Sequence, residues 1–238
     1  MHIVVISLQE SAERRANITR QFAARSLGFA FFDALTPRRA AHEVAGYDPY
    51  EFFSNCGRLA TDTEIACYAS HLAVWRRCAA GDQPYLILED DAALSADFVS
   101  GLDIVARHVA EKGFIRVSIP AVGDAAGVRR EGAFDVRLCR RVPLLALGYA
   151  VSPPAAQALA AKGALVEEPV DKFLQRFWRH RQRVYALHPP IVGLSECAAV
   201  SAIGPRRRDR YTLSSWLRRV MRKSGNSISR TIANLAYF

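Results

Sequence analysis

Short apolar runs alternate with longer segments of mixed polarity along most of the chain. The run HIVVISL near the N-terminus is rich in β-branched residues and gives way to polar QESAERR. This pattern predicts a buried strand followed by a helix over about residues 11–25. The run FAFFDAL predicts a second strand that has Asp33 at its end. Residues 36–60 mix prolines, glycine and aromatics, so we expect a loop with short helices there.

The segment TDTEIACYASHLAVWRRCAAG carries the clearest local helix signal. Thr61 and Glu64 have the spacing of a capping box, and Gly81 stands where a helix would end. We therefore predict a helix over about residues 62–80. Helical spacing places four side chains on one face: Glu64, Tyr68, His71 and Trp75.

The alternation of strands and helices continues beyond this helix. PYLILEDDA predicts a strand, SADFVSGLDIVARHVAEKG a helix capped by Ser95 and closed by Gly113, and FIRVSI another strand. Further on, GAFDVRLCRRVPLL, ALGYAV and RVYALHPPIV predict strands, and PPAAQALAAKG and PVDKFLQRFWRH predict helices. Such a βαβα order predicts an α/β fold with a mostly parallel sheet flanked by helices, as in Rossmann-like proteins.

Composition narrows the class of protein. The chain has 238 residues, half of them hydrophobic, which is enough to bury a sizeable core. Its five cysteines form no CxxC pair, which favours a reducing compartment over a disulfide scaffold. No apolar stretch approaches the roughly 18 residues of a membrane span. We expect a cytoplasmic protein, soluble or peripheral to a membrane.

The positive charge is concentrated at the C-terminal end. The formal net charge is +9, and residues 204–238 hold nine Lys or Arg against one Asp. The first 203 residues are therefore almost neutral. In the basic segment Trp216, Leu217, Val220 and Met221 fall on one helical side. We predict two parts: a domain over residues 1–203 and a basic amphipathic segment over residues 204–238 that anchors at a membrane surface. The alternative is a solvated helix that packs on the domain.

Three consecutive carboxylates follow the strand in PYLILEDDA: Glu89, Asp90 and Asp91. One acid at this place has an ordinary structural explanation, because acids are favoured at a helix N-terminus. Three adjacent carboxylates repel one another and need a cation or basic partners. Ligands of parallel sheets bind at the carboxyl ends of the strands, so the triplet favours a metal or phosphate role.

The chain resembles glycosyltransferase family 25, the bacterial lipopolysaccharide glycosyltransferases. The resemblance rests on TDTEIACYASHLAVWRRC followed by PYLILEDDA, with VVISLQESAERR and FFDA before them and LGYAVSPPAAQAL, PVDKF and RVYALHPPIV after them. It covers about residues 2–193. It implies a GT-A type fold and an inverting transfer of a hexose, most often galactose from UDP-galactose, to a hydroxyl of lipopolysaccharide, lipooligosaccharide or a related glycan.

The resemblance also assigns roles to the acidic triplet. Asp91, helped by Glu89 or Asp90, matches the family's DxD-like element and would hold Mn²⁺ (or Mg²⁺) against the donor diphosphate. A divalent ion suits that task because it neutralises the charge that develops on the leaving group. His188 before PPIV is a further metal-ligand candidate, although a lone histidine is seldom a ligand.

An inverting transfer needs a base that takes the proton from the acceptor hydroxyl. Asp171 in EEPVDKF is our candidate, and its alternative is an ordinary acid in the first turn of a helix. Glu64 is the competing base, yet it also has the position of the capping-box glutamate.

The remaining site candidates would bind the donor: Ser7, Leu8, Arg14, Asp33 and His71. Ser7 stands where the family usually has Asn, and Asp33 has the alternative role of a turn residue at the end of its strand. Trp75 shares the face of His71, but an aromatic residue at helical spacing more often belongs to the core.

Two other functional classes are alternatives to a glycosyltransferase. A nucleic-acid-binding protein would use the basic tail, but the nearly neutral domain carries no binding motif, so we expect no nucleic-acid partner. A catalytically inactive relative that serves as a binding or scaffold protein is the alternative to the enzyme, because a fold does not fix a function. Retention of all three carboxylates favours the enzyme, at the inner face of the bacterial inner membrane.

Overall fold

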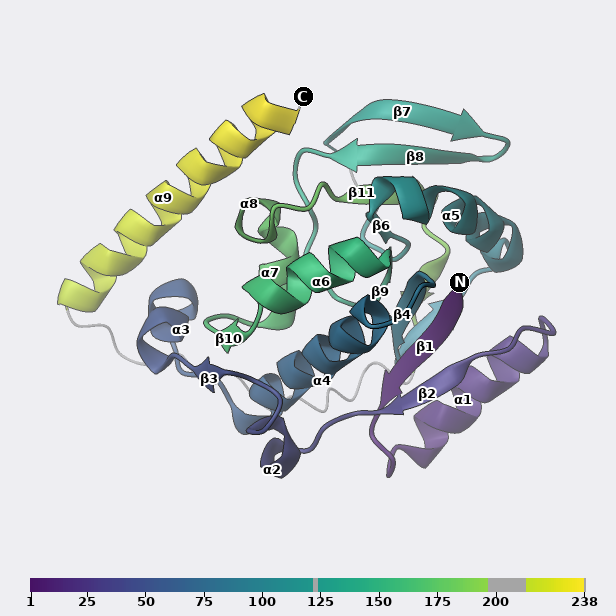
Figure 1. Ribbon diagram of the computed structural model, residues 1–238, viewed down its shortest axis with the longest axis horizontal. Helices are drawn as coiled ribbons and strands as arrows, with labels where there is room; N and C mark the ends of the chain where they lie inside the picture. The colour runs from purple at the N-terminus through teal and green to yellow at the C-terminus, as the bar shows by residue number, and fades with distance from the viewer. Residues whose placement is uncertain (122–123, 197–212, 238) are drawn as a thin grey trace.

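The computed structural model of the protein describes residues 1–121, 124–196 and 213–237 (Figure 1). Within them, helices cover an eight-stranded mixed sheet of order β2-β1-β4-β9-β6-β11-β8-β7. Six of these strands run in one direction, and β9 and β8 run in the other. The prediction of an α/β fold with a mostly parallel sheet is confirmed. Reversal of β9 in the middle of the sheet was not predicted.

The N-terminal elements follow the apolar pattern closely. Their bounds are β1 His2–Ser7, α1 Ala12–Ala23, β2 Ala30–Asp33, α2 Pro37–Ala40, β3 Gly46–Tyr47, α3 Pro49–Cys56 and α4 Asp62–Ala79. The capping box of α4 is present, because Thr61 Oγ1 accepts from the Glu64 N–H and the Glu64 carboxylate accepts from the Thr61 N–H. The loop with short helices expected over residues 36–60 is α2 and α3, joined by the two-residue strand β3.

The rest of the chain completes the sheet and its cover. The bounds are β4 Tyr85–Glu89, β5 Ala92–Leu94, α5 Phe98–Lys112, β6 Phe114–Arg116, β7 Ala125–Glu131, β8 Phe134–Cys139, β9 Gly148–Val151, α6 Pro153–Lys162, β10 Leu165–Val166, α7 Val170–Gln175, α8 Phe177–His180, β11 Tyr185–His188, β12 Val192–Leu194 and α9 Leu213–Tyr237. Strands β12 and β5 pair outside the main sheet, as do β10 and β3.

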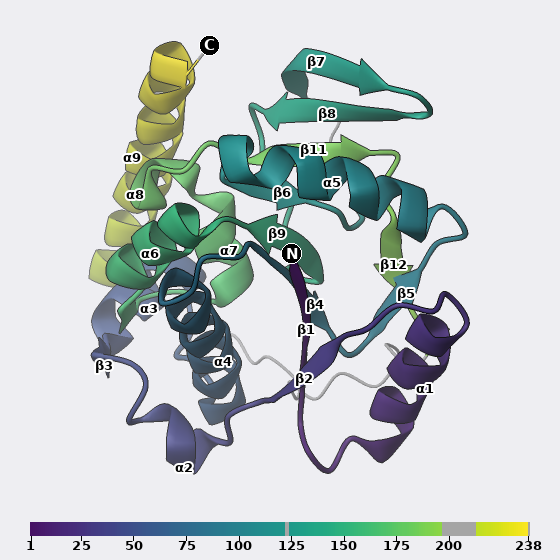
Figure 2. The same ribbon diagram turned by 45° about the vertical axis from the view of Figure 1, so that its right-hand side comes forward.

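Both faces of the central strands β1, β4 and β9 are buried, which explains their continuous apolar runs. Alternate residues of β1 and β4, such as Val4 and Ile87, point into the cluster under α4, α6 and α7. Their neighbours, such as Val5 and Leu88, point into a second cluster under α1 and α5. Figure 2 shows α5 on one side of the sheet and the pair α4 and α6 on the other. The strand ends are thereby held between two rigid layers.

Four predictions about later elements need correction. The N-cap position of α5 is held by Asp97, without a side-chain capping hydrogen bond, rather than by Ser95, although Gly113 closes the helix as predicted, with φ +77°. The segment PVDKFLQRFWRH is two short helices, because Arg176 has non-helical angles of φ −88° and ψ 63°. The strand in GAFDVRLCRRVPLL is β8, and its hairpin partner β7 was not predicted. RVYALHPPIV is divided into β11 and β12, since its adjacent prolines offer no N–H groups to a sheet.

Within the predicted C-terminal segment, residues Leu213–Tyr237 form the helix α9. It packs on α3 and α8, at the opposite side of the molecule from α1 (Figure 1). The predicted division between residues 203 and 204 lies outside the described residues, as do residues 204–212. Among the described helices, none has both the length and the apolar character needed to cross a membrane.

Candidate active site

A pocket of about 420 Å³ opens at the carboxyl ends of β1 and β4. Seven of the residues that line it are predicted site residues: Ser7, Leu8, Arg14, His71, Glu89, Asp90 and Asp91. The α2 segment and the start of α4 form the opposite wall. A crevice at the strand ends is where ligands of α/β sheets bind.

Strand register explains why distant residues meet there. In the parallel pairing of β1 with β4, Ile6 lies beside Glu89, and in the pairing of β1 with β2, Ser7 lies beside Asp33. Three strands therefore end at the same level. The chain then turns at Asp90 and Asp91 into β5, so the acidic triplet is presented at the pocket rather than continued along the sheet.

Asp90 is fully engaged with the first strand and helix. Its Oδ2 accepts a hydrogen bond of 2.7 Å from Ser7 Oγ, and its Oδ1 forms a 3.0 Å ion pair with Arg14. Its side chain is 11% exposed. Charge-assisted contacts of this kind offset the desolvation of a carboxylate. Asp90 therefore joins β1, α1 and β4 at the edge of the pocket.

Asp91 lies in a different environment. Its Oδ1 is buried and has no hydrogen-bond partner among the described residues. The pKa of Asp91 is raised to about 6, chiefly by burial and also by the neighbouring charges of Glu89 and Asp90, against the opposing effect of Arg14. A buried polar atom without a hydrogen-bond partner lowers the stability of the fold, and a bound ligand would remove that cost. Asp91 is thus the member of the triplet that is open to a cation.

Glu89 is oriented by a chain of buried side chains. Trp75 Nε1 donates to the Tyr149 hydroxyl at 2.9 Å, and that hydroxyl lies 2.7 Å from His71 Nδ1. Burial raises the pKa of Tyr149, so its phenol stays protonated. Its O–H can therefore donate a hydrogen bond to His71 Nδ1. The hydrogen of His71 is then on Nε2, which lies 3.3 Å from Glu89 Oε1 and donates to it. Trp75 is core, as expected, and it supports His71.

Arg15 joins the ends of the first two strands. It donates to the Ser7 carbonyl at 3.0 Å and to the Leu8 carbonyl at 3.1 Å, and it pairs with Asp33. Asp33 does not line the pocket, and its side chain is half exposed beside this guanidinium. In this structure Asp33 and Arg15 fix the loop after β1.

The two predicted bases lie outside the residues that line the pocket. Glu64 has a side chain that is 2% exposed and a 2.5 Å ion pair with Arg58, in addition to its place in the capping box. Asp171 lies half-buried in the first turn of α7, where its Oδ1 accepts from the Lys172 N–H at 2.8 Å. The position of Glu64 matches its structural alternative.

His188 lies at the end of β11, opposite Asp135 in the antiparallel backbone pairing of β11 with β8. Its Nδ1 is buried without a hydrogen-bond partner among the described residues. It does not line the pocket, so the structure does not place it with Asp91 and Glu89.

Three residues of the site were not singled out from the sequence. Cys67 and Glu10 line the pocket, and Tyr149 holds His71. Cys67 precedes His71 by four residues on α4, so helical spacing alone would have pointed to it. Glu10 follows the end of β1, which is also a local signal. Tyr149 comes from the reversed strand β9, and no local signal leads to it.

A comparison with protein families shows which family this chain belongs to. Residues 1–120, half of the chain, match the profile of glycosyltransferase family 25, described as LPS biosynthesis protein. The chain belongs to glycosyltransferase family 25. This match contains β1, α4 and the acidic triplet, which are the elements that build the pocket.

Curated relatives of this family-25 chain match over a shorter region. Lipooligosaccharide biosynthesis protein lic2B of Haemophilus influenzae is 38% identical over 98 residues, 40% of this chain and 35% of that protein. Lacto-N-neotetraose biosynthesis glycosyltransferase LgtB of Neisseria meningitidis is 38% identical over 96 residues, 38% of this chain and 32% of that protein. The chain thus aligns with about a third of the length of these relatives.

Among solved structures, mannose-1-phosphate geranyltransferase from Thermus thermophilus aligns with 82% of this chain and 74% of its own. The TM-score is 0.34 and the sequence identity 11%, which is too low to carry a conclusion about fold or activity.

Proposed function

We propose that this protein is an inverting glycosyltransferase of lipooligosaccharide or related glycan assembly. Its donor would be a nucleotide sugar, with UDP-galactose as the first candidate, and its acceptor a glycan hydroxyl. Family membership supports the transferase class, and the names of the relatives support the acceptor class. The observation that carries the proposal is the pocket at the ends of β1 and β4, where one carboxylate oxygen, Asp91 Oδ1, is buried without a partner among the described residues.

The residues at the acidic edge fit a hard divalent cation. Asp91 and Glu89 are the carboxylates that would hold it, because Asp90 is already paired with Ser7 and Arg14. A bound Mn²⁺ or Mg²⁺ would supply Lewis-acid stabilisation of the charge that develops on a departing nucleoside diphosphate. His71 contacts the Glu89 carboxylate at 3.3 Å, and Arg14 pairs with Asp90 at 3.0 Å.

The general base of this proposal is Asp171. Glu64 is less suited to the role, since its carboxylate is held by Arg58 and by the capping box. Asp171 lies half-buried in the first turn of α7, where its carboxylate accepts from the N–H of Lys172. Substitution Asp171→Asn should lower kcat while the affinity for UDP stays unchanged. An unchanged kcat would remove Asp171 from the mechanism.

Calorimetric titration of UDP and UDP-galactose tests the donor site. We expect binding with Mn²⁺, loss of binding after addition of EDTA, and loss of binding in Asp91→Asn. The matched control is Asp103→Asn, which changes an exposed aspartate of α5 and should bind as the unaltered protein does. Tight binding that ignores both EDTA and Asp91 would refute the metal role, and no binding at all would favour the inactive relative.

We also propose that α9 brings the enzyme to a membrane surface. Four apolar side chains, spaced so that they form one stripe, are 60–80% exposed: Met221, Ile228, Ile232 and Leu235. Lys223 is exposed as well, whereas Arg222 turns to the domain and pairs with Glu51. The side chains of Trp216, Leu217, Arg218 and Arg219 lie outside the described residues. The stripe has the character of an interfacial helix, and an acceptor attached to lipid would be presented there.

Sedimentation with lipid vesicles tests this anchor. The protein should bind vesicles that contain anionic lipid, and Ile228→Asp with Ile232→Asp should abolish the binding. Ser224→Asp adds a charge at another exposed position of α9 and serves as the control for charge alone. Self-association without vesicles that the same pair of substitutions removes would identify a second copy as the occupant and overturn the proposal.

A further inference from the structure

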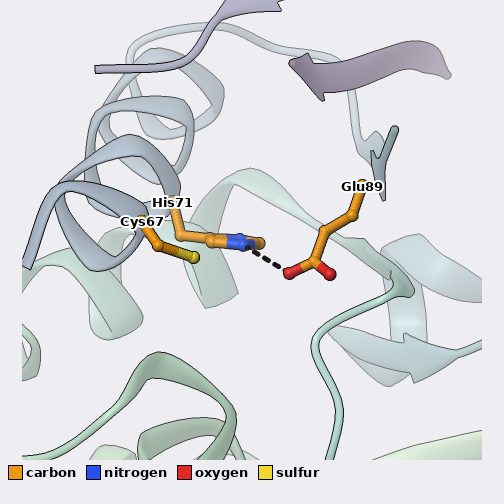
Figure 3. A group of neighbouring side chains, drawn as sticks. All are labelled: Cys67, His71 and Glu89. Atoms are coloured by element: carbon orange, nitrogen blue, oxygen red, sulfur yellow. Dashed lines mark hydrogen bonds and ion pairs between the residues drawn. The ribbon is translucent and has the colours of Figure 1, made fainter. Parts of the chain in front are cut away.

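A group of three different ligand types lies on the wall of the pocket. Cys67 and His71 project from α4, one turn apart, toward the carboxylate of Glu89 at the end of β4 (Figure 3). One sulfur, one nitrogen and one oxygen from these residues all lie within 4.8 Å of one another. Cys67 and Glu89 are half-buried and His71 is fully buried. All three line the pocket, so the group is reached from solvent through it.

The spacing is close to that of a metal site. In a tetrahedral site with metal–ligand bonds of about 2.0–2.3 Å, neighbouring ligand atoms lie about 3.3–3.8 Å apart. The distance from His71 Nε2 to Glu89 Oε1 is 3.3 Å. The Cys67 sulfur needs at most a small movement to complete the set, because all three atoms already lie within 4.8 Å.

The ring of His71 is held through Nδ1, the nitrogen that does not face Glu89. Tyr149 contacts its Nδ1 at 2.7 Å, and Trp75 in turn contacts Tyr149 at 2.9 Å. This chain leaves Nε2 as the nitrogen that faces Glu89. On metal binding the ring proton would move from Nε2 to Nδ1, where the Tyr149 oxygen accepts it, and the Cys67 thiol proton would leave to solvent.

The ligand types select the ion. Thiolate and imidazole ligands suit Zn²⁺ and similar transition metals, whereas Mg²⁺ and Mn²⁺ prefer oxygen. Three protein ligands also leave one position open toward the pocket, as in zinc sites that bind water or a substrate group.

We propose that Cys67, His71 and Glu89 form a binding site for one transition-metal ion of the zinc type. This site is separate in its chemistry from the hard-cation site proposed at Asp91. The two share Glu89, so an ion at Cys67 and His71 withdraws that carboxylate from the acidic edge. Zinc should therefore weaken the Mn²⁺-dependent binding of UDP.

Cobalt(II) is the probe, because thiolate ligation gives it a sulfur-to-metal charge-transfer absorption. The full-length protein, freed of metal, should develop this absorption until one equivalent of Co²⁺ is bound, and Zn²⁺ should remove it. The absorption should be lost in Cys67→Ser and strongly reduced in His71→Gln. It should persist in Cys56→Ser, which alters another half-buried cysteine, and in Asp91→Asn.

Two results would overturn the inference. One is an unaltered protein that shows no thiolate absorption with Co²⁺, and the other is an absorption that survives Cys67→Ser. Circular dichroism of each variant checks that the fold is kept. The proposed function fails by a different result, namely indifference of UDP binding to Mn²⁺ and to Asp91.

Discussion

Two carboxylate clusters of this protein differ in how their negative charge is compensated by nearby cations. The first is the acidic edge, Glu89, Asp90 and Asp91, where Arg14 is the guanidinium that pairs with the triplet in the part of the chain the structure describes. The second is the α7–α8 ion network, which consists of Glu167, Glu168, Arg176 and Arg179. In the network two carboxylates meet two guanidinium groups, and Glu168 lies 2.7 Å from Arg176 and 2.8 Å from Arg179.

Burial acts on both clusters, but the opposing charges differ. The Glu168 side chain is 1% exposed, and burial raises its pKa against the attraction of Arg176 and Arg179. For Asp91, burial and its acidic neighbours together raise the pKa to about 6, and Arg14 is the cation that opposes them. The network pairs each carboxylate with a guanidinium group, although Glu168 Oε2 meets Arg176 as an ion pair without hydrogen-bond geometry. At the acidic edge, Asp91 Oδ1 has neither kind of partner among the described residues. A structural cluster and a binding site differ in that respect.

The largest expected effect comes from breaking the network. Arg176→Met removes one of the two guanidinium groups that hold buried Glu168, and it should lower the free energy of unfolding by about 3–5 kcal/mol. Urea unfolding measures the loss. Arg107→Met is the control, because Arg107 is 60% exposed and its pair with Glu131 lies at the surface. Similar losses in the two variants would contradict the contrast between buried and exposed pairs.

The next effect is the contribution of His180, which lies next to Arg179 of the network, to the pH dependence of stability. Burial lowers the pKa of His180 from 6.5 to about 4, while Nε2 contacts the Leu174 carbonyl and Nδ1 accepts from the Gln182 N–H. The unfolded chain binds the proton more readily, so stability should fall as the pH drops from about 6.5 to about 4, by up to about 3 kcal/mol.

Unfolding at a series of pH values, with His180→Gln as the comparison, isolates this contribution. The variant should lose part of the slope between pH 6.5 and 4. His42→Gln removes an exposed histidine and should keep the slope. Identical slopes in the unaltered protein and His180→Gln would refute the assignment.

Asp91→Asn should raise the free energy of unfolding rather than lower it. Because the folded protein raises the pKa of Asp91, ionisation at pH 7 costs stability, and removal of the charge should stabilise the metal-free protein by about 1–3 kcal/mol. Asp90→Asn should destabilise it, since Asp90 loses its charge-assisted contacts with Ser7 and Arg14. Unfolding of both variants at pH 7 is the measurement, and a shift in the same direction would show that the two aspartates are equivalent.

The smallest effect sharpens the contrast within the acidic edge. Ser7→Ala removes the 2.7 Å hydrogen bond to Asp90 and should cost about 1–2 kcal/mol. Its effect should vanish when Asp90 is already Asn, because the two residues are coupled. A double-mutant cycle of unfolding free energies gives the coupling directly, and additive losses would show that the bond contributes little.

Local signals account for the parts that sequence reasoning predicted correctly. The first strand, the capped helix α4 and the strand that ends at Glu89 are each encoded by apolar runs, a cap and a turn within a few residues. Parallel pairing of β1 with β4 then brings Ser7 and the acidic triplet to the same pocket. The α7–α8 break and the β7–β8 hairpin escaped prediction, because tertiary packing overrides weak local preference there.

The sequence by itself determined the α/β alternation, the position of three carboxylates at a strand end, and the helical face that carries His71. Tertiary structure alone decided how those carboxylates differ. Asp90 meets Ser7 and Arg14, Glu89 meets His71, and Asp91 is left with an open oxygen among the described residues. Partners from residues far apart in the chain make that difference, and their positions follow from strand order and layer packing rather than from any local pattern.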